Sequence, residues 1–214
     1  MTASSSNQSI FNLPNNLTIA RIIMIPVFVL IAYWPPALGV GVPAIQDNAI
    51  ARIGMYEFSD SLLRHVLLTS VFVLAAITDW LDGYFARKMG ISSAFGQFLD
   101  PVADKLMVAA ALIILVQWHA NVIMAIAAIV IISREIAVSA LREWMAELGN
   151  RTSVAVSYVG KLKTTFQMIA IIVLLLNWQS LETLGYVLMV AAVILTLWSM
   201  LIYLKAAWPY LKQN

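Results

Sequence analysis

The chain has 214 residues and a mass of 23.6 kDa; 62% of the residues are hydrophobic and 11% are charged. Soluble domains carry about 25% charged residues, so this composition argues against a soluble globular domain, a disordered chain and a nucleic-acid binder. The net charge of +2 indicates no polyanionic partner, and the absence of cysteine excludes disulfides and thiolate-bound metals. We therefore expect one integral membrane domain.

The uncharged stretches of the chain predict an all-α bundle of six transmembrane helices. Residues 1–13 are polar and contain no Lys or Arg, which indicates a disordered tail and not a signal peptide. The predicted membrane domain spans residues 14–208, with an extracytoplasmic loop at 35–62 and a C-terminal tail at 209–214. The six predicted helices are 17–36, 64–87, 97–118, 121–147, 160–177 and 183–207.

Lysine and arginine are distributed unevenly between the two sides of this bundle. With six spans, both termini lie on one side, and nine basic residues fall on that side against two on the other. The larger group is Arg21, Arg87, Lys88, Arg142, Arg151, Lys161, Lys163, Lys205 and Lys212. An excess of Lys and Arg marks the cytoplasmic side, so we expect both termini and the loops after the second and fourth helices to be cytoplasmic.

Four carboxylates lie next to or inside the apolar runs, where an ionised Asp costs about 2.5–3.5 kcal/mol at the bilayer centre. Asp79 and Asp82 are three residues apart on one helix, and Asp100 and Asp104 are four apart on the next. These spacings place each pair on one helix face. A hairpin would present both pairs to each other, near the cytoplasmic face, as a site for two hard divalent cations. A proton or cation pathway, or a charge pair that locks the helices, is the alternative.

Small residues and an arginine complete a longer pattern around these aspartates. The pattern is Asp79-x2-Asp82-Gly83-x2-Ala86-Arg87-x8-Gly96-x3-Asp100-x3-Asp104. It resembles the signature of the CDP-alcohol phosphatidyltransferases at all eight fixed positions. The resemblance implies that the four aspartates hold two Mg²⁺ or Mn²⁺ ions and that Asp104 is also the general base. It further implies CDP-diacylglycerol contacts from Asn15, Thr18, Gly83, Ala86, Arg87 and Ser93.

Three other segments are similar to the family members that use sn-glycerol 3-phosphate as acceptor. They are residues 12–21, 133–149 and 160–165, and the similarity runs from about Asn12 to Tyr203. This resemblance implies transfer of the phosphatidyl group of CDP-diacylglycerol to sn-glycerol 3-phosphate, giving phosphatidylglycerophosphate and CMP. It also implies a bacterial inner-membrane protein that forms a homodimer.

A dianionic acceptor needs a basic pocket, and four residues are candidates for it. Arg134 lies in an apolar stretch, where an arginine is costly and therefore a functional candidate, although a structural pair with Glu135 is the alternative. Lys161 and Lys163 begin the fifth helix and are equally explained as cytoplasmic anchors. Arg21, at the start of the first helix, is similarly ambiguous.

Two other functions stay open from the sequence. The same family includes enzymes with other acceptors, inositol phosphate or phosphatidylglycerol among them. The basic residues favour a phosphorylated acceptor but do not distinguish glycerol 3-phosphate from inositol phosphate. A small cation or proton transporter would use the aspartates as a pathway, but it would not need Gly83, Ala86 and Arg87 in that order. Transporters also commonly show paired, interrupted repeats, which this sequence lacks.

Overall fold

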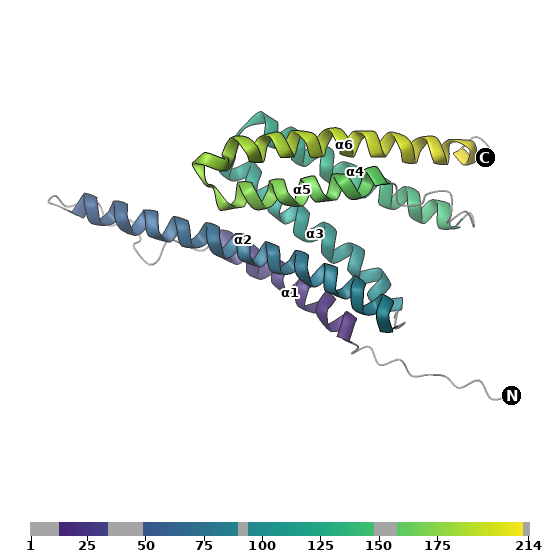
Figure 1. The fold of residues 1–214 in the computed structure, drawn as a ribbon, viewed down its shortest axis with the longest axis horizontal. Helices are drawn as coiled ribbons and strands as arrows, with labels where there is room; N and C mark the ends of the chain where they lie inside the picture. The colour runs from purple at the N-terminus through teal and green to yellow at the C-terminus, as the bar shows by residue number, and fades with distance from the viewer. Residues whose placement is uncertain (1–12, 34–48, 90–93, 148–157, 212–214) are drawn as a thin grey trace. The chain divides into compact units, whose positions relative to one another are not determined.

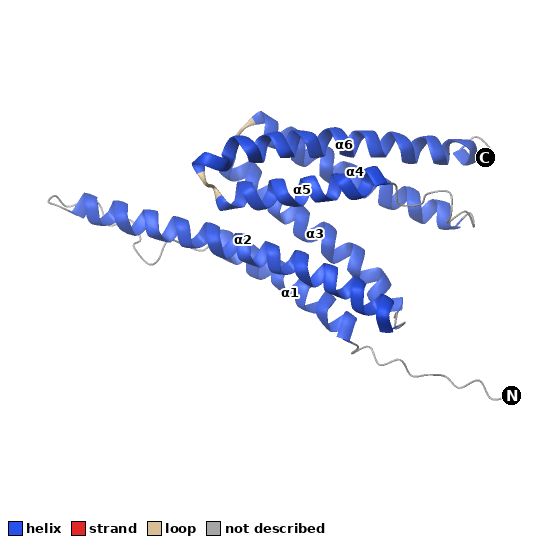
Figure 2. Ribbon diagram, in the orientation of Figure 1, coloured by secondary structure: helices blue, strands red, loops and turns tan. Residues whose placement is uncertain are grey.

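A computed structural model describes residues 13–33, 49–89, 94–147 and 158–211 of the chain. Within these ranges, the side chains of 13–15, 49–61, 82–87, 89, 94–98, 158, 210 and 211 are not described. All regular structure in the described residues is helical (Figure 2), which confirms the all-α prediction. The six helices are α1 (Leu13–Ala32), α2 (Ala49–Met89), α3 (Ala94–His119), α4 (Val122–Glu147), α5 (Tyr158–Leu176) and α6 (Gln179–Leu211).

Helix α2 differs most from its predicted bounds, because it begins at Ala49 and not at residue 64. Its first turns therefore occupy part of the segment 35–62, for which we predicted an extracytoplasmic loop. The charged residues of this part hid the helix from a search for apolar runs, yet charge does not oppose helix formation and no proline interrupts the stretch. The position of residues 35–62 outside the membrane stays a prediction.

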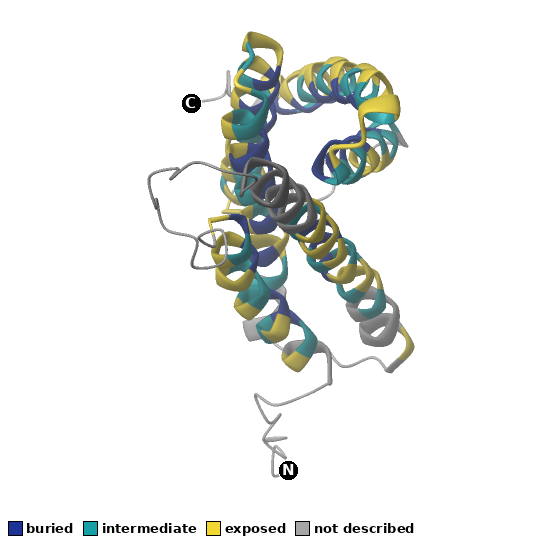
Figure 3. Ribbon diagram, turned by 90° about the vertical axis from the view of Figure 1, so that its left-hand side faces the viewer, coloured by how far each residue is buried: buried dark blue, intermediate teal, exposed yellow. Residues whose placement is uncertain are grey.

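Four stretches of the described residues are long and apolar enough to cross a membrane. They are Leu62–Leu81, Val122–Glu147, Val159–Leu176 and Gln179–Pro209, and Asn16–Ala32 forms a shorter apolar helix. Exposed residues line the helices (yellow in Figure 3), and many of them are large and apolar. Trp80, Val122, Ile129 and Val187 are examples. Such a surface is unfavourable in water and favourable in lipid, which supports an integral membrane protein.

The chain divides into two compact units, Met1–Ala110 and Ala111–Asn214. In the first unit, α1 lies along α2 (Figure 1). Phe28 and Phe72 are fully buried there, with ring centroids 6.3 Å apart. The first part of α3 belongs to the same unit, which therefore contains α1 and both segments that carry the expected aspartates.

In the second unit, α5 and α6 form an antiparallel hairpin, and α4 packs against α6. Helices α5 and α6 approach each other closely at Gly185 of α6, which has no side chain. A Cβ at this position would lie 2.7 Å from Cδ2 of Leu174, nearer than side chains tolerate. A glycine therefore sets the separation of these two helices.

The two described turns of the second unit lie where turn-forming residues predicted them. Ala120 and Asn177 have positive φ values of 42° and 49°. Asn adopts this conformation at a helix C-terminus more readily than most residues. Asn121 then caps α4, because its Oδ1 accepts a 2.9 Å hydrogen bond from the backbone N–H of Met124.

Candidate functional site

The expected carboxylates lie on two helices of the first unit. Asp79 is in α2, and Asp100 and Asp104 are in the first turns of α3. Half of the Asp79 side chain is exposed, and Asp104 is exposed too. Asp82 is in α2, but its side chain lies outside the described residues. The same holds for the expected substrate contacts Asn15, Gly83, Ala86, Arg87 and Ser93, and of these Ser93 lies outside the described backbone as well.

Helix α1 contacts carboxylates of both other helices. Thr18 donates a hydrogen bond from Oγ1 to Oδ1 of Asp100. One turn later, Nη1 of Arg21 lies 2.8 Å from Oδ1 of Asp79. Thr18 and Arg21 are each only 1% exposed. The first unit therefore joins α1, α2 and α3 through two polar contacts at two of the signature aspartates.

The donor chemistry of this region fits a hard divalent cation. Carboxylate oxygens are the ligands that Mg²⁺ and Mn²⁺ prefer, and Asp79 keeps half of its side chain accessible while one oxygen contacts Arg21. No group of three His, Asp or Glu side chains close enough to hold a metal is found among the described residues, which do not include the Asp82 side chain. The two-metal site stays a prediction.

A second polar cluster lies between apolar helices in the other unit. Arg134 of α4 and Lys163 of α5 are both buried, and both contact Oε1 of Glu135. Nη1 of Arg134 lies 3.3 Å from this oxygen. Nη2 of Arg134 also donates a 2.9 Å hydrogen bond to Oγ of Ser199 in α6. Three helices thus meet at this cluster, which we call the basic cluster.

A tyrosine of α6 extends the basic cluster toward the C-terminal end of α4. The guanidinium of Arg134 lies 5.3 Å from the ring centroid of Tyr203, and that of Arg142 lies 5.0 Å from it. Arg142 also donates a 2.7 Å hydrogen bond to the Tyr203 hydroxyl. The sequence analysis missed Ser199, Tyr203 and Arg142. The sequence offered only a weak signal for them: Ser199 and Tyr203 are four residues apart in an apolar helix, and Arg142 follows the apolar run of α4.

The basic cluster carries more cation than anion. Arg134 and Lys163 bring two positive charges, whereas Glu135 brings one negative charge. Nε of Arg134, Oε1 of Gln167 and Oγ1 of Thr196 are buried and have no hydrogen-bond partner among the described residues. Gln167 follows Lys163 by one turn, and Thr196 precedes Ser199 by one turn. The Arg134 N–H and the Thr196 hydroxyl can donate to an anion, whereas the Gln167 oxygen can only accept.

The structure brings together two of the four predicted acceptor-binding residues. Arg134 and Lys163 come together, whereas Lys161 is an exposed residue of α5. Arg21 lies in the other unit and contacts Asp79. The pair between Arg134 and Glu135, which the sequence offered as an alternative to phosphate binding, is present. Lys163 contacts the same Glu135 oxygen, so both buried cations lie beside one carboxylate.

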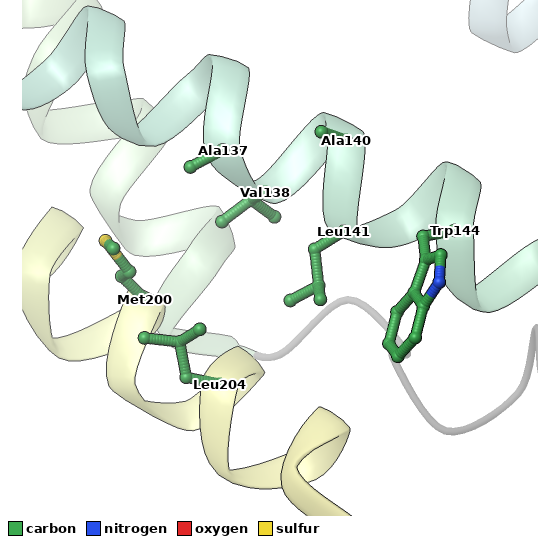
Figure 4. A pocket seen from close by; sticks show the side chains of 7 residues that line it. All are labelled: Ala137, Val138, Ala140, Leu141, Trp144, Met200 and Leu204. Carbon is green, nitrogen blue, oxygen red and sulfur yellow. The ribbon is translucent and has the colours of Figure 1, made fainter. Parts of the chain in front are cut away.

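The groove between α4 and α6 is not a candidate for phosphate or metal binding. Figure 4 shows only apolar side chains along it. The lining residues are Ala137, Val138, Ala140, Leu141 and Trp144 of α4 and Met200 and Leu204 of α6. A surface of this kind suits a hydrocarbon chain better than a charged group.

Apolar helices that carry a carboxylate region and a basic cluster define an integral membrane protein with polar sites. The sequence profile of the CDP-alcohol phosphatidyltransferase family matches residues 11–198, and the chain belongs to this family. The chain is 47% identical over 207 residues to a Pseudomonas fluorescens protein, covering 95% of this chain and 93% of the relative. It is 44% identical to a Haemophilus influenzae protein, covering 95% and 97%. Both relatives are named CDP-diacylglycerol–glycerol-3-phosphate 3-phosphatidyltransferase.

Proposed function

We propose that the chain is an integral-membrane enzyme that transfers the phosphatidyl group of CDP-diacylglycerol to sn-glycerol 3-phosphate. The products are phosphatidylglycerophosphate and CMP, which makes the reaction a step in phosphatidylglycerol and cardiolipin synthesis. The observation that carries the proposal is the similarity to relatives of this name over nearly their whole length. The complete aspartate signature supports it. Because the lipid substrate stays in the bilayer, a membrane-embedded enzyme suits this reaction.

The aspartates of the first unit would hold two divalent cations, Asp79, Asp82, Asp100 and Asp104 being the ligands. Bound Mg²⁺ or Mn²⁺ would neutralise charge on the phosphate oxygens during the displacement. The acceptor hydroxyl attacks the phosphatidyl phosphorus, and the bond from this phosphorus to the oxygen of CMP breaks. Asp104 accepts the hydroxyl proton, a role that its exposure permits.

The basic cluster is the proposed site for the phosphate of the acceptor. Arg134 presents a planar group that can donate two parallel hydrogen bonds to a phosphate, and Lys163 adds a point charge. Glu135 holds both cations in place through one oxygen. Because two cations gather beside one carboxylate, a dianionic phosphate would be attracted to the cluster. An acceptor without phosphate would leave these buried charges unmatched.

The proposed location is a bacterial inner membrane. The uneven distribution of Lys and Arg supports cytoplasmic termini and a cytoplasmic active site in a chain that spans the membrane six times. The resemblance to the family supports a homodimer. The chain has no cysteine, so labelling of single introduced cysteines from either side of the membrane would test the topology. Cross-linking in membranes would test the dimer.

The test is release of CMP by purified protein in lipid or detergent. CDP-diacylglycerol and Mg²⁺ or Mn²⁺ are supplied with glycerol 3-phosphate, inositol phosphate, serine or phosphatidylglycerol in parallel, and Asp104→Ala is the matched control. We expect release that needs metal, glycerol 3-phosphate and Asp104. Release with a different acceptor alone would retain the site and contradict the substrate. No release from folded protein, together with cation flux in proteoliposomes, would contradict the enzyme and favour the transporter.

A further inference from the structure

Two polar side chains of α1 are buried in the first unit, although most residues of this helix are apolar. Thr18 and Arg21 are each 1% exposed, and Arg21 is among the largest fully buried side chains of the described residues. Burial of an arginine is costly unless a carboxylate compensates its charge. A buried arginine one turn from a buried hydroxyl therefore calls for a specific partner for each.

The partners of these two residues are signature aspartates on two different helices. Thr18 donates its hydroxyl to Asp100 of α3, and Arg21 lies 2.8 Å from Asp79 of α2. A single turn of α1 thus restrains one carboxylate from each half of the motif. Apolar packing does not restrain the Asp79 side chain in this way, since half of it is exposed.

The burial of Thr18 and Arg21 argues against the substrate contacts that the sequence suggested for them. Thr18 was expected to contact the nucleotide and Arg21 the acceptor phosphate. With 1% of their surface exposed, both side chains offer almost no area to a substrate. Thr18 donates its hydroxyl to Asp100 instead, and Arg21 forms an ion pair with Asp79 whose geometry is not that of a hydrogen bond from Nη1.

We propose that Thr18 and Arg21 are positioning residues that orient Asp100 and Asp79 for divalent cations. The proposal rests on the proposed function and deepens it, because it names the outer groups that set the metal affinity of the same site. Groups that hydrogen-bond to metal ligands fix the ligands' orientation, and their loss commonly lowers metal affinity 10- to 100-fold. The guanidinium also offsets the repulsion among four neighbouring carboxylates before cations arrive.

The experiment measures Mn²⁺ binding to the purified full-length protein by electron paramagnetic resonance of the free ion, without substrates. We expect Thr18→Val to weaken Mn²⁺ binding roughly 10-fold or more, whereas Thr18→Ser retains the wild-type affinity because it keeps the hydroxyl. Arg21→Gln is expected to weaken binding by a similar factor. Arg21→Lys should lie between, since lysine keeps the charge and loses the planar fork.

Thr69→Val is the matched control for loss of a buried hydroxyl. Thr69 lies in α2 of the same unit and is buried, but its Oγ1 donates to the carbonyl of His65 in its own helix at 2.8 Å. This variant should bind Mn²⁺ as the wild type does. Thermal unfolding without metal identifies variants that fail to fold; if Arg21→Gln is one of them, Arg21→Lys decides the role of Arg21.

Several results would overturn the proposal. Wild-type affinity in Thr18→Val, or an equal loss in Thr69→Val, would reduce Thr18 to a packing residue. Tighter Mn²⁺ binding in Arg21→Gln would make Arg21 a competitor of the metal and not a support for it. If Asp79→Asn binds Mn²⁺ as well as the wild type does, the metal site itself fails, and the positioning proposal falls with it. CMP release that persists in Asp79→Asn would keep the proposed reaction even then.

Discussion

Both polar regions of this membrane protein bury cations, but they differ in the charge of the groups that remain accessible. In the first unit, the cation Arg21 is buried and the carboxylate that it contacts, Asp79, is half exposed. In the second unit, the cations Arg134 and Lys163 are buried around Glu135, whose side chain is 23% exposed. One region thus presents anionic groups, and the other holds an excess of cationic groups.

This difference indicates which ligand each region can accept. A half-exposed carboxylate with a neighbouring buried cation can add a further cation from solution without loss of its support. In the basic cluster two cations contact one carboxylate, a surrounding that favours an added anion over an added cation. In the proposed reaction, the carboxylate region would hold the cations that bind the CDP-diacylglycerol pyrophosphate, and the basic cluster would hold the phosphate of the acceptor.

The largest expected effect comes from the carboxylate region. Asp104→Ala should lower metal-dependent CMP release by roughly 10²–10⁴-fold, because a general base contributes a factor of that size. The assay is CMP release at saturating glycerol 3-phosphate and metal, with thermal unfolding as the check on folding. Retention of more than a tenth of the wild-type rate would remove Asp104 from the reaction.

The basic cluster should respond in the acceptor's kinetics and not in metal binding. Arg134→Gln is expected to lower kcat/KM for glycerol 3-phosphate roughly 10- to 150-fold, since a hydrogen bond to a charged group contributes about 1.5–3 kcal/mol. Mn²⁺ affinity should stay unchanged. Lys205→Gln removes an exposed cation of α6 and serves as the control. An equal effect of Arg134→Gln on Mn²⁺ affinity would break the division between the two regions.

Packing of the second unit can be disturbed without a charge change. Gly185→Leu should destabilise the α5–α6 hairpin by about 1–3 kcal/mol, because even its Cβ would lie 2.7 Å from Cδ2 of Leu174. We expect a lower thermal unfolding temperature, with Mn²⁺ affinity of the folded protein unchanged. Val187→Leu, on the exposed face of α6, is the size-increase control. Equal stability of the two variants would show that the hairpin tolerates a wider separation.

The smallest expected effect is at the edge of the basic cluster. Tyr203→Phe keeps the ring beside Arg134 and Arg142 and removes the hydroxyl that accepts from Arg142. The loss should be about 0.5–1.5 kcal/mol and should appear in KM for glycerol 3-phosphate. Tyr203→Leu also removes the ring, so a larger KM is expected. If the two variants behave alike, contact with the ring adds nothing to the placement of Arg134.

Apolar run length predicted the helices well, because a helix in lipid must be apolar over most of its length. The same signal failed at the start of α2, where the helix continues through charged residues from Ala49. The turns at Ala120 and Asn177 were also foreseeable, since polar and turn-forming residues interrupt the apolar runs there. In these cases the local sequence was sufficient because the cause was local.

The sequence by itself determined the membrane class, the all-α architecture and the aspartate signature of the family, all of which depend on composition or on spacing along one helix. Only the tertiary structure decided which partners the buried charges take. It paired Arg21 with Asp79 and Thr18 with Asp100, and it gathered Arg134, Lys163 and Ser199 from three helices. These contacts join residues far apart in the chain, and the cost of burying a charge in an apolar interior selects among them only when the helices pack.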